Sequence, residues 1–307
     1  MTRLFRIGIV VCLAAAPSAA PLAAQNAAPD VAQEMRLPVL PGSARFLVLG
    51  DAGTGEEAQL QVAAQMVRWR QRFPFTFALM LGDNIYGKER PQDFAKKFER
   101  TYKALLDAGV QFHAALGNHD DPNQRYYKPY NLGGKRYRTF KEGRVRFFVI
   151  DSNYLDPAQM KWLEKELSAS GSDWKIAYFH HPLYTTARRG PEVELRAILE
   201  PLFVKYGVDV VFTGHEHVYE RFKPQKGIHH FTVGGAAKLR RGDTRRSAIT
   251  AATFDQDRSF LLVEIAGDFM HFQAVSRKGV VVDEGVIGRR REAGESARVA
   301  APAAAPR

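Results

Sequence analysis

The stretch FALMLGDNIY, residues 77–86, decides the fold class of this chain. Its first five residues form a short apolar run with the length and composition of a buried strand. Polar side chains begin as soon as the run ends, with Asp83 and Tyr86 following Gly82. A glycine at this point permits unusual dihedral angles and a close approach of neighbouring backbone. The stretch therefore predicts a buried strand that delivers polar side chains at its carboxyl end.

Similar apolar runs occur on both sides of this stretch, at 46–49, 112–116, 145–150, 176–179 and 208–212. Helical periodicity separates several of them, and Asp156 followed by Pro157 provides an N-cap and a first helical residue. Alternating strands and helices indicate a parallel sheet covered by helices. From residue 228 onward, successive strand patterns without long helices suggest a second, mostly antiparallel sheet.

Five of the six apolar runs end in a polar cluster. The clusters are GDAG at 50–53, GDNIY at 82–86, GNHD at 117–120, HH at 180–181 and GHEH at 214–217. Ligands of open α/β sheets bind beyond the carboxyl ends of the strands, so we expect the clusters to converge on one rim. Taken singly, each cluster also fits a turn or a buried histidine. Together they supply the carboxylate, phenol, amide and imidazole groups that divalent and trivalent metal ions select.

The composition describes a chain that can bury a full core. Its 307 residues are 45% hydrophobic and 25% charged, which excludes disorder throughout. A net charge of +11 predicts attraction to phosphorylated substrates, nucleic acid or an acidic surface. The single cysteine, Cys12, excludes an intrachain disulfide framework, a multi-cysteine zinc site and an iron–sulfur cluster. Basic segments at 135–146 and 238–246 are most simply interpreted as solvated loops.

The two ends of the chain differ in composition from the middle. Residues 1–24 combine early arginines, an apolar run too short to span a bilayer and small residues, as is typical of a secretory signal peptide. We therefore expect an exported protein, periplasmic or secreted, with no membrane span. An Ala/Pro-rich linker is predicted at 25–43 and a disordered Arg/Ala/Pro tail at 289–307. The folded domain is then 44–288.

The ordered series GDxG, GDxxY, GNHD, a histidine after a strand and GHxH resembles the calcineurin-like metallophosphoesterases. Tyr86, three residues after Asp83, makes the chain similar to the purple acid phosphatases. HHPLYTTARRGP at 180–191 resembles the matching segment of their short, tartrate-resistant type. The resemblance covers nearly all of 44–288, which would be the catalytic domain. It implies an α/β fold, a four-layer α/β/β/α sandwich in which two sheets with flanking helices hold two metal ions between them.

The resemblance also implies a role for each matching residue. Fe(III) would be bound by Asp51, Asp83, Tyr86 and His217, whereas Fe(II), Zn(II) or Mn(II) would be bound by Asp83, Asn118, His180 and His215. Asp83 would bridge the two ions. The ordinary pKa of tyrosine is near 10, so binding of the tyrosinate at working pH favours a trivalent ion.

The expected activity is that of an exported binuclear-metal phosphatase acting on phosphate monoesters of small molecules. Two metal ions can clamp phosphoryl oxygens and lower the pKa of a bound water, so that hydroxide attacks phosphorus without a protein nucleophile. The resemblance places His119 at the phosphate or the leaving oxygen, with Asp120 as its hydrogen-bond acceptor. Arg189 stands where short-type enzymes usually carry histidine; it cannot be a general acid, but it can grip phosphate.

Other functions remain open on the same residues. A phosphodiesterase or nucleotidase could use this fold, because a metal pair does not decide how many ester bonds the phosphorus carries. A nucleotide substrate is therefore an alternative, whereas no stable nucleic-acid partner is expected. A secreted phosphate- or nucleic-acid-binding module would explain the charge but not the ligand-type residues, and an iron protein with peroxidase-like chemistry would require peroxide-dependent turnover. The sequence sets no expectation for the oligomeric state.

Overall fold

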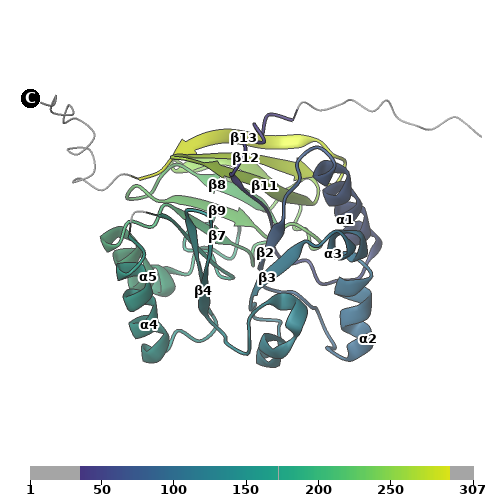
Figure 1. Cartoon of the computed structure of the whole chain (residues 1–307), viewed down its shortest axis with the longest axis horizontal. Coiled ribbons are helices and arrows are strands. Elements are labelled where there is room, and N and C mark those ends of the chain that lie inside the picture. The colour runs from purple at the N-terminus through teal and green to yellow at the C-terminus, as the bar shows by residue number, and fades with distance from the viewer. Residues whose placement is uncertain (1–34, 172, 291–307) are drawn as a thin grey trace, which may run out of the picture. The chain divides into compact units, whose positions relative to one another are not determined.

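The computed structural model describes residues 35–171 and 173–290, which fold around two mixed β-sheets (Figure 1). The first sheet has six strands in the order β13-β12-β11-β1-β2-β3. Strands β1, β2 and β3 are parallel, and β11 joins them by pairing antiparallel with β1. Their bounds are β1 Ala44–Leu49, β2 Phe77–Leu81, β3 Gln111–Ala115, β11 Ser259–Ala266, β12 Phe269–Ser276 and β13 Val281–Gly288.

The second sheet has seven strands in the order β10-β8-β9-β7-β6-β5-β4. Strands β5, β6, β7 and β9 are mutually parallel neighbours, while β4, β8 and β10 pair antiparallel at the two sides. Their bounds are β4 Arg138–Glu142, β5 Val145–Val149, β6 Trp174–Phe179, β7 Val210–Thr213, β8 Tyr219–Phe222, β9 His229–Val233 and β10 Thr250–Phe254.

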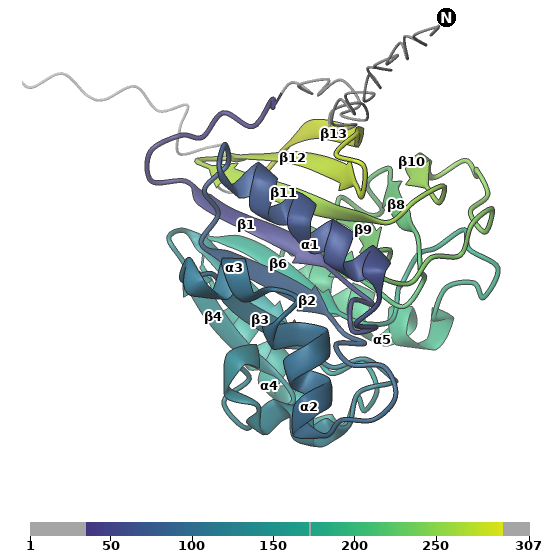
Figure 2. The ribbon, with the colours of Figure 1, turned by 90° about the vertical axis from the view of Figure 1, so that its right-hand side faces the viewer.

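Helices cover the outer faces of both sheets. Figures 1 and 2 show α1, α2 and α3 outside the first sheet, and Figure 1 shows α4 and α5 outside the second. Helix α4 begins after Asp156, whose side chain accepts from the backbone nitrogen of Gln159, as the Asp-Pro pair predicts. The bounds are α1 Glu57–Arg70, α2 Pro91–Phe94, η1 Ala95–Glu99, α3 Lys103–Asp107, η2 Pro122–Tyr126, η3 Lys128–Tyr130, α4 Pro157–Ser168 and α5 Val193–Lys205.

The core lies between the two sheets and under the helices. The ring of Phe46 on β1 contacts those of Phe147 on β5 and Phe212 on β7, with centroids 5.4 and 6.4 Å apart. A separate apolar cluster joins the second sheet to α4 and α5, through Leu163 and Phe203 among others. Full burial of each such side chain contributes about 1.5–3 kcal/mol of transfer free energy. The layers are therefore helix, sheet, sheet and helix, which confirms the expected four-layer α/β/β/α sandwich.

The expected separate antiparallel sheet after residue 228 is wrong. Strands β11, β12 and β13 extend the first sheet beyond β1, and β9 enters the second sheet beside β7. In β11, seven of the eight residues are buried, because both faces of this strand are covered. Local periodicity predicts a strand but leaves its partner open, and here the partner is set by packing against β1.

The terminal predictions fall mostly outside the described residues. The signal peptide at 1–24, residues 25–34 of the linker and residues 291–307 of the tail belong to this group. Residues 35–43 lie along β11, where Leu37 is 4% exposed and the backbone nitrogens of Val39 and Leu40 donate to the carboxylate of Glu264. No helix in the part that the structure describes is both long and apolar enough to cross a bilayer.

Candidate metal centre

The carboxyl ends of strands from both sheets meet at one place. Strands β1, β2 and β3 point there from the first sheet, and β6 and β7 from the second. The sheets approach so closely that a Cβ added at Gly214 would lie 2.9 Å from the carbonyl oxygen of Leu81. The predicted single rim is therefore formed by the facing ends of two sheets.

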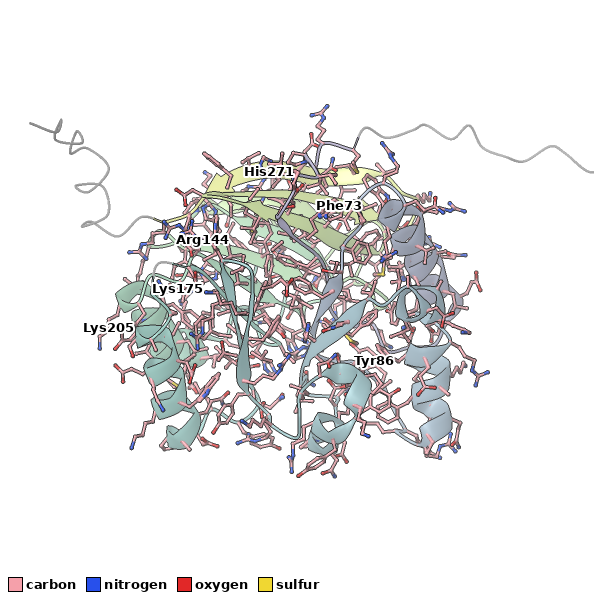
Figure 3. All side chains as sticks on the ribbon, in the orientation of Figure 1. Phe73, Tyr86, Arg144, Lys175, Lys205 and His271 are labelled. Carbon is pink, nitrogen blue, oxygen red and sulfur yellow. The ribbon has the colours of Figure 1, made fainter. Side chains whose placement is uncertain are left out.

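One group of donors consists of Asp51, Asp83, Tyr86 and His217. The phenol oxygen of Tyr86, which is labelled in Figure 3, lies 3.0 Å from Asp51 Oδ1 and 3.2 Å from His217 Nε2. His217 Nε2 is 3.4 Å from Asp51 Oδ1. The donor atoms of Asp51, Asp83 and His217 all lie within 4.8 Å of one another, a spacing that a single metal ion could span.

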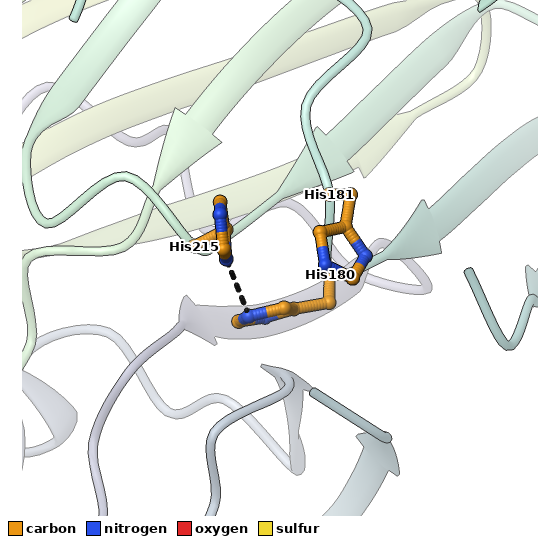
Figure 4. A group of neighbouring side chains, drawn as sticks. All are labelled: His180, His181 and His215. Carbon is orange, nitrogen blue, oxygen red and sulfur yellow. Dashed lines mark hydrogen bonds between the residues drawn. The ribbon is translucent and has the colours of Figure 1, made fainter. Parts of the chain in front are cut away.

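A second group of donors lies beside the first. His215 Nδ1 is 3.1 Å from His180 Nε2 and 2.9 Å from Asn118 Oδ1. A dashed line in Figure 4 marks the contact between the two histidines. His180 Nε2 is 3.0 Å from Asn118 Oδ1 and 3.4 Å from Asp83 Oδ1. Asp83 therefore contacts both groups, and the structure brings together all seven predicted ligands.

The ring of His180 is oriented by the first sheet. Its Nδ1 lies 2.8 Å from the carbonyl oxygen of Leu81, which can only accept, so Nδ1 carries the proton. The lone pair of Nε2 then faces Asn118, His215 and Asp83. A hydrogen bond that fixes the tautomer in this way is typical of histidines that ligate metals.

Three of the donors have strained backbones. Asp51, Asp83 and His215 have φ angles of 56°, 51° and 67°, in the left-handed region that non-glycine residues seldom adopt. Such a conformation costs about 1–3 kcal/mol per residue and persists only where surrounding contacts impose it. Here Asp51 N donates to the Gly82 oxygen at 3.1 Å, and His215 N donates to Asp51 Oδ2 at 2.8 Å. Strain concentrated in this way is characteristic of functional sites.

The charge balance of the donors favours a bound cation. Asp51 and Asp83 are 0% and 1% exposed, and burial together with Asp83 raises the pKa of Asp51 well above its ordinary value. Burial and the two carboxylates also raise the pKa of Tyr86. Burial lowers the pKa of His215 to about 2 and that of His217 to about 4. Neutral imidazoles beside crowded acidic oxygens fit a metal site.

Gly117 allows the loop after β3 to pass against Asp83. A Cβ at this position would lie 2.2 Å from both the backbone nitrogen and Oδ1 of Asp83, so the backbone would have to move. We expect Gly117→Ala to lower the free energy of unfolding by more than about 2 kcal/mol and to reduce metal binding. Thermal unfolding and metal titration measure both effects. Gly288→Ala, with nothing within 4 Å of the added Cβ, is the control, and equal behaviour of the two variants would contradict the close approach.

His181, which is not among the seven predicted ligands, lies beside the second donor group. Its ring centroid is 4.7 Å from that of His215, and His180, His181 and His215 bring one nitrogen each within 4.8 Å (Figure 4). Its Nδ1 lies 2.8 Å from the hydroxyl of Ser152. The consecutive histidines after β6 are the sequence signal for this position.

Two of the three residues expected to act in catalysis, His119 and Arg189, lie next to the donors. The backbone nitrogen of His119 donates to Asp83 Oδ1 at 3.0 Å, and its ring centroid is 5.1 Å from that of Tyr86. Arg189 is exposed, and its Nη1 lies 2.9 Å from His215 Nε2.

Asp120 has a different environment from the one expected. Its buried carboxylate accepts from the backbone nitrogens of Gly117, Asn84 and Ile85 at 2.8 to 3.1 Å, and from the side chain of Gln124 at 2.8 Å. Burial is the largest cause of its pKa of about 8. These bonds connect the loops after β2 and β3, whereas the expected role was to orient the ring of His119.

The segment 238–246 contributes residues that sequence reasoning missed. Lys238 Nζ lies 4.8 Å from the ring centroid of Tyr86, and its backbone nitrogen donates to the Asp51 oxygen at 3.3 Å. Arg240 Nη1 lies 3.3 Å from Glu216 Oε2, and burial raises the pKa of Glu216 to about 7. The beginning of this segment therefore lies against the donors, unlike the solvated loop that the charge run suggested.

A cavity of about 420 Å³ opens beside the second donor group. Polar side chains dominate its wall, and they include Asn118, Ser152, Asn153, Tyr154, His181 and Glu192. A molecule attached to a phosphoryl group at the donors can extend into this space.

A sandwich that gathers carboxylate, imidazole, amide and phenol ligands at facing strand ends defines a metal-dependent hydrolase. The model of the calcineurin-like phosphoesterase family matches residues 44–219, and the chain belongs to that family. This assignment confirms the resemblance seen in the motifs and makes the protein a phosphoric ester hydrolase.

Characterised relatives include acid phosphatases. Tartrate-resistant acid phosphatase type 5 of Mus musculus is 25% identical, over 62% of this chain and 71% of its own. Purple acid phosphatase 17 of Arabidopsis thaliana is 26% identical, over 66% of this chain and 71% of its own. The structure of a purple acid phosphatase from yellow lupin (Lupinus luteus) seeds superposes with a TM-score of 0.66 at 19% identity, covering 82% of this chain and 55% of the lupin chain, which supports the fold.

Proposed function

We propose that this protein is a binuclear metal-dependent phosphatase that hydrolyses phosphate monoesters. The observation that carries the proposal is the position of Asp83, in contact with both donor groups. The names of the relatives, tartrate-resistant and purple acid phosphatases, support monoesters over diesters.

Each donor group would hold one metal ion. The first would use Asp51, Asp83, Tyr86 and His217, and the second Asp83, Asn118, His180 and His215. Bound ions would supply Lewis-acid activation of water and of the phosphoryl oxygens. We assign Fe(III) to the first group, because the buried phenol of Tyr86 ionises only beside a strong Lewis acid, and Fe(II), Zn(II) or Mn(II) to the second.

The chain's own residues bind and orient the substrate around the ions. The His119 side chain is exposed beside Tyr86, with the two ring centroids 5.1 Å apart, and its imidazole would donate to a phosphoryl or leaving-group oxygen. Asp120 would act as a positioning residue, because its hydrogen bonds hold the loops that carry Asp83 and Asn118.

Arg189 would bind phosphate. Its contact with His215 Nε2 requires that nitrogen to be the acceptor. A ring that coordinates through Nδ1 carries its proton on Nε2 and cannot accept from Arg189. The guanidinium would then be free to grip the substrate's phosphoryl oxygens.

Replacing this arginine should therefore affect substrate binding. We expect Arg189→Ala to raise KM for a phosphate monoester by about tenfold, the scale of a lost charge-assisted hydrogen bond, with a smaller change in kcat. Arg188→Ala, whose guanidinium nitrogen Nε lies 3.3 Å from Asp243, is the matched control. An unchanged KM in Arg189→Ala would rule out phosphate binding by this side chain.

The monoester preference is tested by comparing kcat/KM for 4-nitrophenyl phosphate and bis(4-nitrophenyl) phosphate. We expect the monoester to be preferred by more than about tenfold, because two metal ions and Arg189 favour the more highly charged dianion. Preference for the diester would replace this proposal with a phosphodiesterase on the same fold.

We also propose that the protein is exported through the predicted signal peptide at 1–24. Phosphatase activity in the extracytoplasmic fraction of expressing cells would test this proposal.

A further inference from the structure

A groove of about 680 Å³, distinct from the cavity beside the donors, has none of the predicted metal ligands in its wall. Its walls come from η2, from the segment 134–139 that enters β4, and from α4. Figures 1 and 2 both show β4 near α4. The volume lies in the range of small-molecule sites. The groove contains the first part of the basic segment 135–146, which the metal centre does not use.

Cations outnumber anions along this groove. Arg125, Lys135, Arg136 and Arg138 line it, against a single carboxylate, that of Glu166. Among the described residues, ion pairs engage Arg136 but none of the other three cations.

The carboxylates near the groove are already occupied. Glu166 pairs with Arg146 at 2.5 Å, and Arg136 binds Asp151 at 2.7 Å and Asp156 at 2.6 Å. The remaining positive charge is therefore available to an anionic ligand.

Aromatic rings alternate with these cations. The ring centroids of Tyr137 and Trp162 are 4.8 Å apart. The Arg125 guanidinium lies 4.7 Å from the ring centroid of Tyr126, which is 62% exposed. Partly exposed ring faces beside cations are the features that stack nucleobases and hold their phosphates.

We propose that this groove binds a phosphorylated nucleoside, with its base against Tyr137 and Trp162 and its phosphate at Lys135 and Arg125. An aliphatic phosphate would leave the ring faces unused, and an uncharged aromatic molecule would leave the cations unused. A free nucleotide and the terminal nucleotide of a single strand share this chemistry. The site is separate from the metal centre, so binding there does not require hydrolysis.

Fluorescence of Trp162 provides a direct test. The other tryptophans, Trp69 and Trp174, are 6% and 2% exposed, so a ligand in the groove quenches chiefly Trp162. AMP is titrated into the full chain carrying Asp83→Asn, which is expected not to hydrolyse it, and inorganic phosphate is left out because it would compete for the cations of the groove. We expect saturable quenching, with weaker binding of adenosine and of ribose 5-phosphate. If a short single-stranded oligonucleotide binds more tightly than AMP, the natural ligand is the end of a strand. If the two bind equally, the natural ligand is the free nucleotide.

A matched pair of lysine variants locates the binding. Lys135→Glu should weaken AMP binding by about tenfold, the loss expected for one charge-assisted contact. Lys161→Glu, an exposed lysine next to Trp162 but outside the groove lining, should change it little. Both variants should keep wild-type phosphatase activity, which separates this inference from the proposed function. Absence of saturable quenching, or equal weakening by the two variants, would overturn the assignment.

Discussion

Asp83→Asn is expected to abolish phosphatase activity and to reduce the metal content. Asp83 is 1% exposed and lies within 3.4 Å of His180, while also belonging to the group with Asp51 and His217. The substitution keeps the size of the side chain but removes the charge that faces both groups. The loss in kcat/KM should exceed the roughly 10–100-fold that follows removal of a group hydrogen-bonded to a metal ligand.

Steady-state kinetics and metal analysis of the purified variant measure this prediction. Asp107→Asn is the matched control, because Asp107 is an exposed aspartate paired with Lys103 at 2.8 Å. Circular dichroism must show that both variants are folded. An Asp83→Asn variant that keeps two metal ions and its activity would contradict the shared role of this carboxylate.

Removal of metal should destabilise the protein, and the metal-free protein should become less stable as pH rises above about 6.5. Chelation should lower Tm by about 10 °C or more, since a ligand at 1,000 times its Kd contributes about 4 kcal/mol and each kcal/mol shifts Tm of a domain this size by about 2–4 °C. Two bound ions would hold the carboxylates of the site deprotonated, whereas the metal-free protein must bury them without a cation.

The direction with pH follows from the buried groups of the metal-free protein. Burial raises the pKa of Asp120 to about 8 and of Glu216 to about 7, so their contribution to stability is present at low pH and is lost as pH rises through these values. Burial lowers the pKa of His215 to about 2 and of His217 to about 4, so their contribution is lost as pH falls below about 6.5.

Above about pH 6.5, His215 and His217 no longer make the free energy of unfolding depend on pH, so that the dependence comes from Asp120 and Glu216 alone. The metal-free protein should therefore lose about 2–3 kcal/mol of its free energy of unfolding between pH 6.5 and 8, because each group contributes about 1.4 kcal/mol per pH unit only up to its own pKa, about 8 for Asp120 and about 7 for Glu216. Thermal unfolding across this range, with and without chelator, measures the effect. A metal-free protein whose stability rises from pH 6.5 to 8 would contradict it.

Much of the fold could be predicted from the sequence because its strands are short apolar runs that end in glycine and polar residues. The run at 77–81 is β2 itself, and the Asp156-Pro157 pair begins α4. The helical faces were less predictable. Leu60, Ala63 and Val67 have the spacing of one apolar stripe of α1, but Leu60 is 42% exposed whereas Met66, outside that stripe, is fully buried. The packed sheet decides which face of a weakly amphipathic helix is covered.

The convergence of the seven predicted metal ligands was predictable to a similar extent and for a related reason. The seven donors follow strand ends, and the topology brings strand ends together. The pairing of β11 with β1 was not predictable, because strands far apart in the chain choose partners by packing. The positions of Lys238 and Arg240 were missed for the same reason, since a basic run has no periodicity that shows which of its residues face a site.

The most direct test of the binuclear phosphatase is to determine metal content, visible absorption and 4-nitrophenyl phosphate hydrolysis in one preparation. We predict two metal ions per chain, hydrolysis that chelation removes and the metals restore, and a broad visible band from Tyr86 that is lost in Tyr86→Phe. A protein that binds no metal and hydrolyses no phosphate ester after reconstitution would contradict the account.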